Sequence, residues 1–127
     1  MTAKSAAVIF GLIFIAAGCL GFVDNPIIGN SDKAIFHADR FHNGVHIGSG
    51  ILFLLVALAA PASAGIVLKL FGLVYLAIGI AGMVQFGQGM GKLFGLLHVN
   101  RNDNILHIVL GIVIFLAGFM RSRRSVI

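Results

Sequence analysis

Two stretches of the sequence repeat the residue types that are best able to bind a metal ion. His46 and His107 each lie three residues after an asparagine, Asn43 or Asn104, and the two stretches are 61 positions apart. A neutral imidazole is the commonest protein ligand for metals and suits zinc, copper and iron. The pattern therefore predicts a pair of equivalent histidines near the starts of two related helices.

His42 and Asp103 extend this pair into a candidate metal-binding set. Residues four apart share a helix face, so His42 would lie beside His46, and Asp103 beside His107, if each helix begins one turn earlier. Three imidazoles and one carboxylate would suit zinc, or an iron or copper ion. In an alternative arrangement, His46 and His107 alone are the axial ligands of one haem. The cofactor thus stays open between a transition metal and haem.

The same region also has a purely structural interpretation, which we favour from the sequence alone. Asn43 and Asn104 would act as N-caps by accepting hydrogen bonds from the free backbone N–H groups of the first helical turn. Arg40 and Arg101 would anchor the preceding loops on carbonyl groups or on lipid phosphates. A third alternative is a path for a proton or a small solute, because ionisable groups near a membrane are often functional.

The repeat extends over most of the chain. Identical residues recur 61 positions later at many places in the first copy, among them Phe10, Gly11, Gly18, Gly21, His37, Arg40 and Gly50. Shared hydrophobicity does not explain matched polar residues, so the chain is predicted to be two copies of a helical hairpin, about residues 6–60 and about residues 66–120. Each copy holds two spans, so both enter the membrane in the same direction. The spacing leaves open whether His37 and His98 join the same site.

Composition places the hairpins in a membrane. Hydrophobic residues make up 59% of the 127 residues and charged residues only 10%, with a mean hydropathy of +1.06, too apolar for the surface of a soluble domain. Spans are expected at about residues 6–23, 43–60, 66–84 and 104–120. The predicted fold is all-α: an integral membrane four-helix bundle of two parallel-repeat hairpins, forming a single transmembrane domain over residues 1–127. Close helix contacts are expected at Gly11, Gly18, Gly21, Gly44, Gly48, Gly72, Gly79, Gly82, Gly111 and Gly118.

The positive charges predict the orientation. Three arginines cluster at the C-terminal end, and cationic segments favour the cytoplasmic side, so both termini are expected in the cytoplasm of a bacterium, with the chain in its inner (plasma) membrane. The sequence pI of about 10.2 fits this topology better than it fits nucleic-acid binding. Cys19 is the single cysteine, which excludes an intramolecular disulfide and a CxxC metal site.

Two motifs resemble a known family. Phe94-Gly95-Leu96, Asn100 and Asp103-Asn104-x-Leu106-His107-x-x-x-Gly111 resemble the signature of a bacterial family of small four-span membrane proteins known only as a domain of unknown function. Asn43-x-x-His46-x-x-x-Gly50 is similar to the first-half motif of that family. The resemblance covers essentially the whole chain and implies four helices, but it implies no activity.

The predicted role is a non-enzymatic structural or accessory membrane component. Its expected partners are the lipid bilayer and either further copies of the chain or a larger membrane complex. The alternatives are a metal- or haem-binding redox module that uses His46 and His107, and a small-solute or proton conduit.

Overall fold

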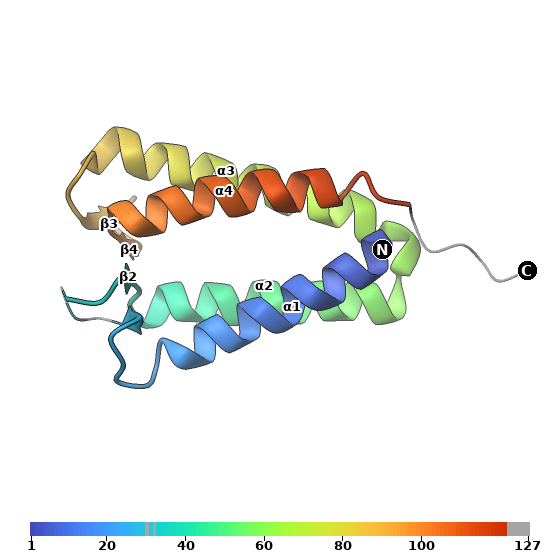
Figure 1. The fold of residues 1–127 in the computed structure, drawn as a ribbon, viewed down its shortest axis with the longest axis horizontal. Helices are drawn as coiled ribbons and strands as arrows, with labels where there is room; N and C mark the ends of the chain where they lie inside the picture. The colour runs from blue at the N-terminus through green and yellow to red at the C-terminus, as the bar shows by residue number, and fades with distance from the viewer. Residues whose placement is uncertain (30, 32, 122–127) are drawn as a thin grey trace, which may run out of the picture.

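The computed structural model describes residues 1–29, 31 and 33–121, and helices account for most of this part of the chain (Figure 1). The four α-helices among these residues are α1 (Ala3–Leu20), α2 (Arg40–Ala59), α3 (Ala64–Phe86) and α4 (Arg101–Ala117). A single 3-10 turn, η1 (Pro61–Ser63), joins α2 to α3. The N-terminus, the C-terminal end of α4 and η1 lie at one end of the molecule, and the two longer loops lie at the other.

Three helical segments are long and apolar enough to cross a membrane. They are Ala3–Leu20, Arg40–Ala59 and Pro61–Phe86, with mean hydropathies of 2.0, 1.6 and 2.2. The fourth helix, α4, has 17 residues, which is at the short end of the range for a membrane span. The composition and these lengths are those of a membrane protein.

The prediction of an all-α chain is wrong in the loops. Strands β1 (Ile28–Gly29) and β2 (Phe36–His37) pair in parallel between α1 and α2, whereas β3 (Gly91–Leu93) and β4 (Leu97–Val99) form an antiparallel hairpin between α3 and α4. The strands satisfy backbone N–H and C=O groups in the segments between the predicted spans. The loops of the two halves therefore differ in structure, although the helices that they join share a pattern.

Glycines bring the helices together in two pairs, α1 with α2 and α3 with α4. A β-carbon on Gly50 would lie 2.6 Å from the carbonyl oxygen of Gly11, and one on Gly111 would lie 2.7 Å from that of Gly72. Such distances leave no room for a side chain, so glycine permits direct backbone contact. The same contact thus occurs in both pairs, at positions 61 residues apart.

Gly44 and Gly48 do not follow the predicted pattern. Both are exposed, and apart from the neighbouring residues and the backbone of α2 itself, no heavy atom of the described chain lies within 4 Å of the place where a β-carbon would be. The face of α2 that contacts α1 carries Gly50 instead, because the helix is rotated so that Gly44 and Gly48 point away from the protein.

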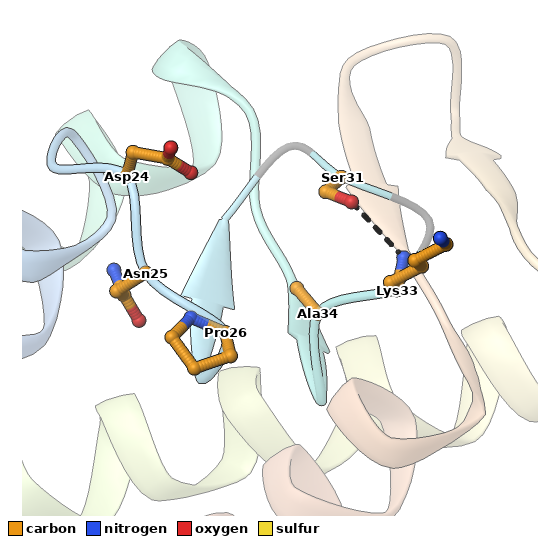
Figure 2. A pocket seen from close by; sticks show the side chains of 6 residues that line it. All are labelled: Asp24, Asn25, Pro26, Ser31, Lys33 and Ala34. Carbon is orange, nitrogen blue, oxygen red and sulfur yellow. Dashed lines mark hydrogen bonds between the residues drawn. The ribbon is translucent and has the colours of Figure 1, made fainter.

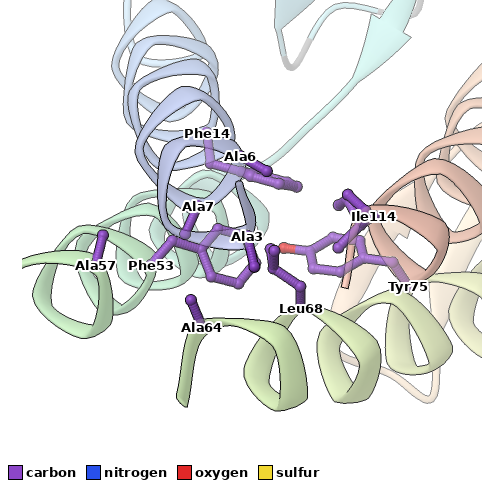
Figure 3. Close-up of a cluster of buried hydrophobic side chains, with 11 residues drawn as sticks. Ala3, Ala6, Ala7, Phe14, Phe53, Ala57, Ala64, Leu68, Tyr75 and Ile114 are labelled. Atoms are coloured by element: carbon purple, nitrogen blue, oxygen red, sulfur yellow. The ribbon is translucent and has the colours of Figure 1, made fainter. Parts of the chain in front are cut away.

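Side chains from all four helices meet in one apolar core, shown in Figure 3. Small alanines near the starts of α1 and α3 allow these helices to approach closely, and the rings of Phe14, Phe53 and Tyr75 fill the wider middle. The core consists of Ala3, Ala6, Ala7, Phe14, Phe53, Ala57, Ala64, Leu68, Tyr75, Ile114 and Ala117. It occupies the part of the molecule nearer to the N-terminus and η1, which leaves the buried polar groups at the loop end.

Candidate metal-binding site

The two helices that carry the histidines begin three residues earlier than predicted. The side chain of Asp39 caps α2 by accepting a hydrogen bond from the backbone N–H of His42, at 2.9 Å. Asn100 caps α4 in the same way, accepting from the N–H of Asp103 at 2.8 Å. For α4 the sequence carried this signal, since Asn100 is followed three positions later by Asp103, and a capping residue followed by an acidic residue at this spacing is typical of a helix start.

Asn43 and Asn104 are therefore not the N-caps, which corrects the prediction. Each lies in the second turn of its helix, nearly fully buried, and its amide presses against a glycine of the neighbouring helix, Gly21 or Gly82. Any β-carbon at these glycines would collide with the asparagine amide. The identical asparagines thus fill the crossing of each helix pair, and their role is packing within the pair.

The earlier helix start brings three histidines together. One ring nitrogen from each of His42, His46 and His107 lies within 4.8 Å of the other two. The ring centroids of His42 are 4.6 Å from His46 and 5.3 Å from His107. Because His107 comes from α4 and the others from α2, the cluster joins the two helix pairs. This is the face-sharing arrangement that the four-residue spacing of His42 and His46 predicts.

Hydrogen bonds leave nitrogen atoms of the cluster available to a ligand. Nδ1 of His42 lies 3.0 Å from the backbone carbonyl oxygen of His98. A carbonyl can only accept, so Nδ1 carries the proton and Nε2 of the neutral ring keeps its lone pair. Among the described residues, Nδ1 of His46 and Nδ1 of His107 are buried without a hydrogen-bond partner. Unsatisfied buried nitrogens are costly, and a bound ion would satisfy them.

Asp103, the fourth member of the predicted ligand set, is not in the group of residues whose ligand atoms lie within 4.8 Å of one another. Its Oδ2 accepts hydrogen bonds from the backbone N–H of Asn100, at 2.8 Å, and of His37, at 3.0 Å. The second bond crosses from α4 to β2 and fastens the first loop to the second helix pair. The carboxylate of Asp103 thus joins the two loops through hydrogen bonds to their backbones. This role accounts for its difference from His42, the residue 61 positions earlier.

The two remaining histidines, His37 and His98, lie in the loop strands next to the cluster. The rings of His37 and His98 meet at a centroid distance of 3.8 Å, and His98 supplies the carbonyl that orients His42. The side-chain amides of Asn100 and Asn102 both donate to the carbonyl oxygen of Ile35, at 3.1 and 2.9 Å. The question that the spacing left open is thereby answered for His98: it joins the site through its backbone.

Two aromatic rings close the cluster on the side of the core. Neither was among the predicted site residues. Phe14 packs on His46 and Tyr75 packs on His107, each at a centroid distance of 5.7 Å. The Tyr75 hydroxyl shares a hydrogen bond of 2.9 Å with Ser49. Phe14 and Tyr75 are 61 positions apart, and this spacing together with the aromatic type was a signal that could have found them.

Arg40 and Arg101, the predicted loop anchors, are exposed at the first position of α2 and of α4. Among the described residues, Asn100, Asn102 and Asp103 bind the first loop through hydrogen bonds to the backbone of Ile35 and His37. In the first loop, Ser31 Oγ accepts from the Lys33 N–H beside a shallow surface cavity (Figure 2). That cavity is lined by Asp24, Asn25, Pro26, Ser31, Lys33 and Ala34, so it contains none of the histidines.

The ring contacts favour a single ion over haem. A haem held by His46 and His107 would place its macrocycle between these two rings. The ring of His42 already contacts both of them and would lie in the way of the macrocycle. Three nitrogens around one point are instead the donor set of a small ion.

The fold and the buried polar residues define a class of protein: small, mostly helical proteins with helices that are long and apolar enough to cross a membrane. Within that class, the chain belongs to the family described as Domain of unknown function (DUF4383), whose family model matches residues 4–120. The resemblance seen in the sequence motifs is therefore confirmed. No curated protein and no solved structure matches the chain.

Proposed function

We propose that this protein is a four-span integral membrane protein that binds one transition-metal ion between its two helical hairpins. His42, His46 and His107 are the ligands. The observation that carries the proposal is the convergence of three ring nitrogens within 4.8 Å, from helices of both pairs. Imidazole donors suit zinc, copper, nickel and iron, so the ion belongs to this group.

The ligands need only a small movement to reach bonding geometry. Zinc–nitrogen bonds of about 2.0–2.1 Å imply roughly 3.4 Å between the ligand atoms of a tetrahedral site. The three nitrogens lie within 4.8 Å, so side-chain rotations that shift each atom by about 1 Å are sufficient. The carbonyl of His98 holds His42 in the required tautomer, as an outer-shell partner does in metal sites.

The membrane role follows from the same arrangement. We propose that the two hairpins are repeats that form a four-helix bundle in the bacterial inner membrane, with α4 as the fourth span and both termini in the cytoplasm. The histidine cluster then lies near the outer surface. The ion links the hairpins, which makes the protein a metal-dependent accessory component of the membrane, acting as an oligomer or with a larger complex.

A conduit for solutes or protons receives less support. The buried polar side chains gather at the loop end, and beyond Tyr75 the part of the core nearer to the N-terminus and η1 is built of alanine, leucine, isoleucine and phenylalanine side chains. Such a core offers no continuous polar path among the described residues. A set of buried polar side chains that extends through only part of the protein suits a bound ion better than the transport of a solute or proton.

Metal analysis of the purified protein tests the proposal. The protein is isolated in detergent with an affinity tag free of histidine, and its metal content is measured after dialysis against one equivalent of Zn²⁺. We expect one ion per chain, and less than a tenth of that in His46→Ala and His107→Ala. The matched control is His98→Ala, which removes an imidazole near the site but keeps the backbone carbonyl, and it should retain the ion.

Two results would contradict the proposal. One is a wild-type protein that holds no zinc, copper, nickel or iron after titration with each. The other is an equal loss of metal in His98→Ala and His107→Ala, which would mean that the imidazoles bind metal without the selectivity that the geometry requires.

A further inference from the structure

We infer that the bound ion keeps one coordination position for an exogenous small ligand, which is water, hydroxide or a small anion. The inference rests on the proposed function and specifies its chemistry. The position faces the core side of the cluster, where Phe14 and Tyr75 pack on the histidines. It makes the site an open one, of the kind in which three protein ligands leave a fourth place to a water or a substrate.

The first step is the number of ligand atoms that converge, which is three among the described residues: one ring nitrogen each from His42, His46 and His107. Oδ2 of Asp103 accepts two backbone hydrogen bonds, and the amides of Asn43 and Asn104 lie against glycines of the adjoining helices. Cys19 is exposed on α1. The described chain thus supplies three ligands to the ion, and a tetrahedral ion needs a fourth.

The second step is the direction in which the fourth position faces. On the loop side, the carbonyl of His98 lies against His42, and the rings of His37 and His98 pack on each other. On the core side, Phe14 contacts His46 and Tyr75 contacts His107, and the two aromatic rings meet each other at 5.1 Å. These two rings are hydrocarbon apart from the Tyr75 hydroxyl, which pairs with the hydroxyl of Ser49, so a ligand bound here is small and poorly hydrated.

The third step is the hydroxyl itself, which breaks the symmetry of the two halves. Tyr75 stands where the first half has Phe14, and its partner Ser49 stands where the second half has Leu110. A tyrosine hydroxyl can both donate and accept, and the bond to Ser49 uses one of these capacities. The other remains for a ligand on the ion. Tyr75 is therefore a positioning residue for that ligand, and Ser49 holds its hydroxyl.

Cobalt spectroscopy of the intact protein tests this inference. Co²⁺ is loaded in place of zinc, its visible absorption is recorded, and sodium azide is titrated in. We expect one Co²⁺ per chain and a saturable change in the spectrum, since azide replaces the exogenous ligand. Tyr75→Phe should bind the same amount of Co²⁺ but bind azide about three- to tenfold more weakly, the effect of losing one neutral hydrogen bond.

The outcomes separate the two proposals. Stoichiometric Co²⁺ whose spectrum does not respond to azide would overturn the open position and leave the metal site standing. A protein that takes up no Co²⁺ or Zn²⁺ would overturn both. Azide affinity that is unchanged in Tyr75→Phe, with a spectral response as in the wild type, would overturn the role of Tyr75. Phe10→Leu, a change in a ring that packs on the core from α1, is the control and should behave as the wild type.

Discussion

At the scale of single residues, equivalent positions in the two halves have taken different roles. His42 contributes a ring to the histidine cluster, while its counterpart Asp103 uses a carboxylate oxygen to hold two backbone N–H groups of the loops. Phe14 and Tyr75 differ by one hydroxyl, which Ser49 pairs. Residues 61 positions apart thus bring different chemistry to the site, so the site is asymmetric.

The variant Asp103→Asn distinguishes a role of the carboxylate in holding the loops from a role as a metal ligand. If Asp103 serves the loops, the variant keeps one metal ion per chain but loses stability, by about 1.5–3 kcal/mol, the value of hydrogen bonds to a charged group. Chemical denaturation in detergent measures the stability, and metal analysis of the same sample measures the ion. Loss of the ion with unchanged stability would show that the carboxylate binds the metal, as the sequence-based ligand set proposed.

At the scale of helices, glycine positions decide which faces touch. Gly111 lies against the backbone of α3, whereas Gly48 has open space around it. Both are glycines at helical positions, so substitution with alanine changes helix propensity by a similar amount at each, about 1 kcal/mol in favour of alanine. Their difference is therefore a difference in packing alone.

Gly111→Ala and Gly48→Ala form a matched pair for this claim. The β-carbon of Gly111→Ala would press on the carbonyl of Gly72 at 2.7 Å, so α3 and α4 must move apart and the melting temperature should fall by several degrees. Gly48→Ala should melt at the wild-type temperature or above it. Circular dichroism in one detergent measures both. Equal destabilisation of the two variants would contradict the observed helix faces.

The sequence predicted the helices better than it predicted their first turns. Hydropathy places all four helices to within a few residues, because long apolar runs leave few alternatives. The caps were assigned to Asn43 and Asn104 instead of Asp39 and Asn100, because several polar residues precede each helix and only hydrogen-bond geometry separates them. That error of one turn decides whether His42 shares a face with His46 inside the helix.

The loops and the aromatic wall were harder to predict. Strands of two or three residues carry too little pattern to be recognised, and the contact of Asp103 with His37 joins residues 66 positions apart. Phe14 and Tyr75 lie in uniformly apolar segments, where any ring is expected to face lipid or core. Only the folded chain shows that these two rings lie on histidines.

At the scale of the whole molecule, the polar and apolar parts are separated along the long axis. The strands lie at one end, and the N-terminus and η1 lie at the other. In a membrane, this separation places the loops at one surface and η1 at the opposite surface if all four helices cross. The orientation, the repeat and the single-domain organisation remain predictions from the sequence.

Cysteine labelling tests the four-span topology, and the single cysteine makes it simple. In a Cys19→Ser background, Lys33→Cys and Gln88→Cys place thiols in the two loops, and Ser63→Cys places one in η1; all three positions are exposed. A membrane-impermeant maleimide added to intact cells should label the loop variants and leave Ser63→Cys unlabelled until the cells are opened. Labelling of Ser63→Cys in intact cells, with protected loops, would reverse the orientation. Labels on Lys33→Cys and Gln88→Cys from opposite sides would contradict the topology itself.

X-ray absorption of the zinc-loaded protein tests the central claim most directly, because it counts the ligands of the ion. The account predicts three imidazole nitrogens at about 2.0–2.1 Å and one further light ligand, with the imidazole scattering reduced in His46→Ala and His107→Ala and unchanged in His98→Ala. A spectrum without imidazole scattering, or one that is the same in the wild type and His107→Ala, would contradict a metal site at His42, His46 and His107.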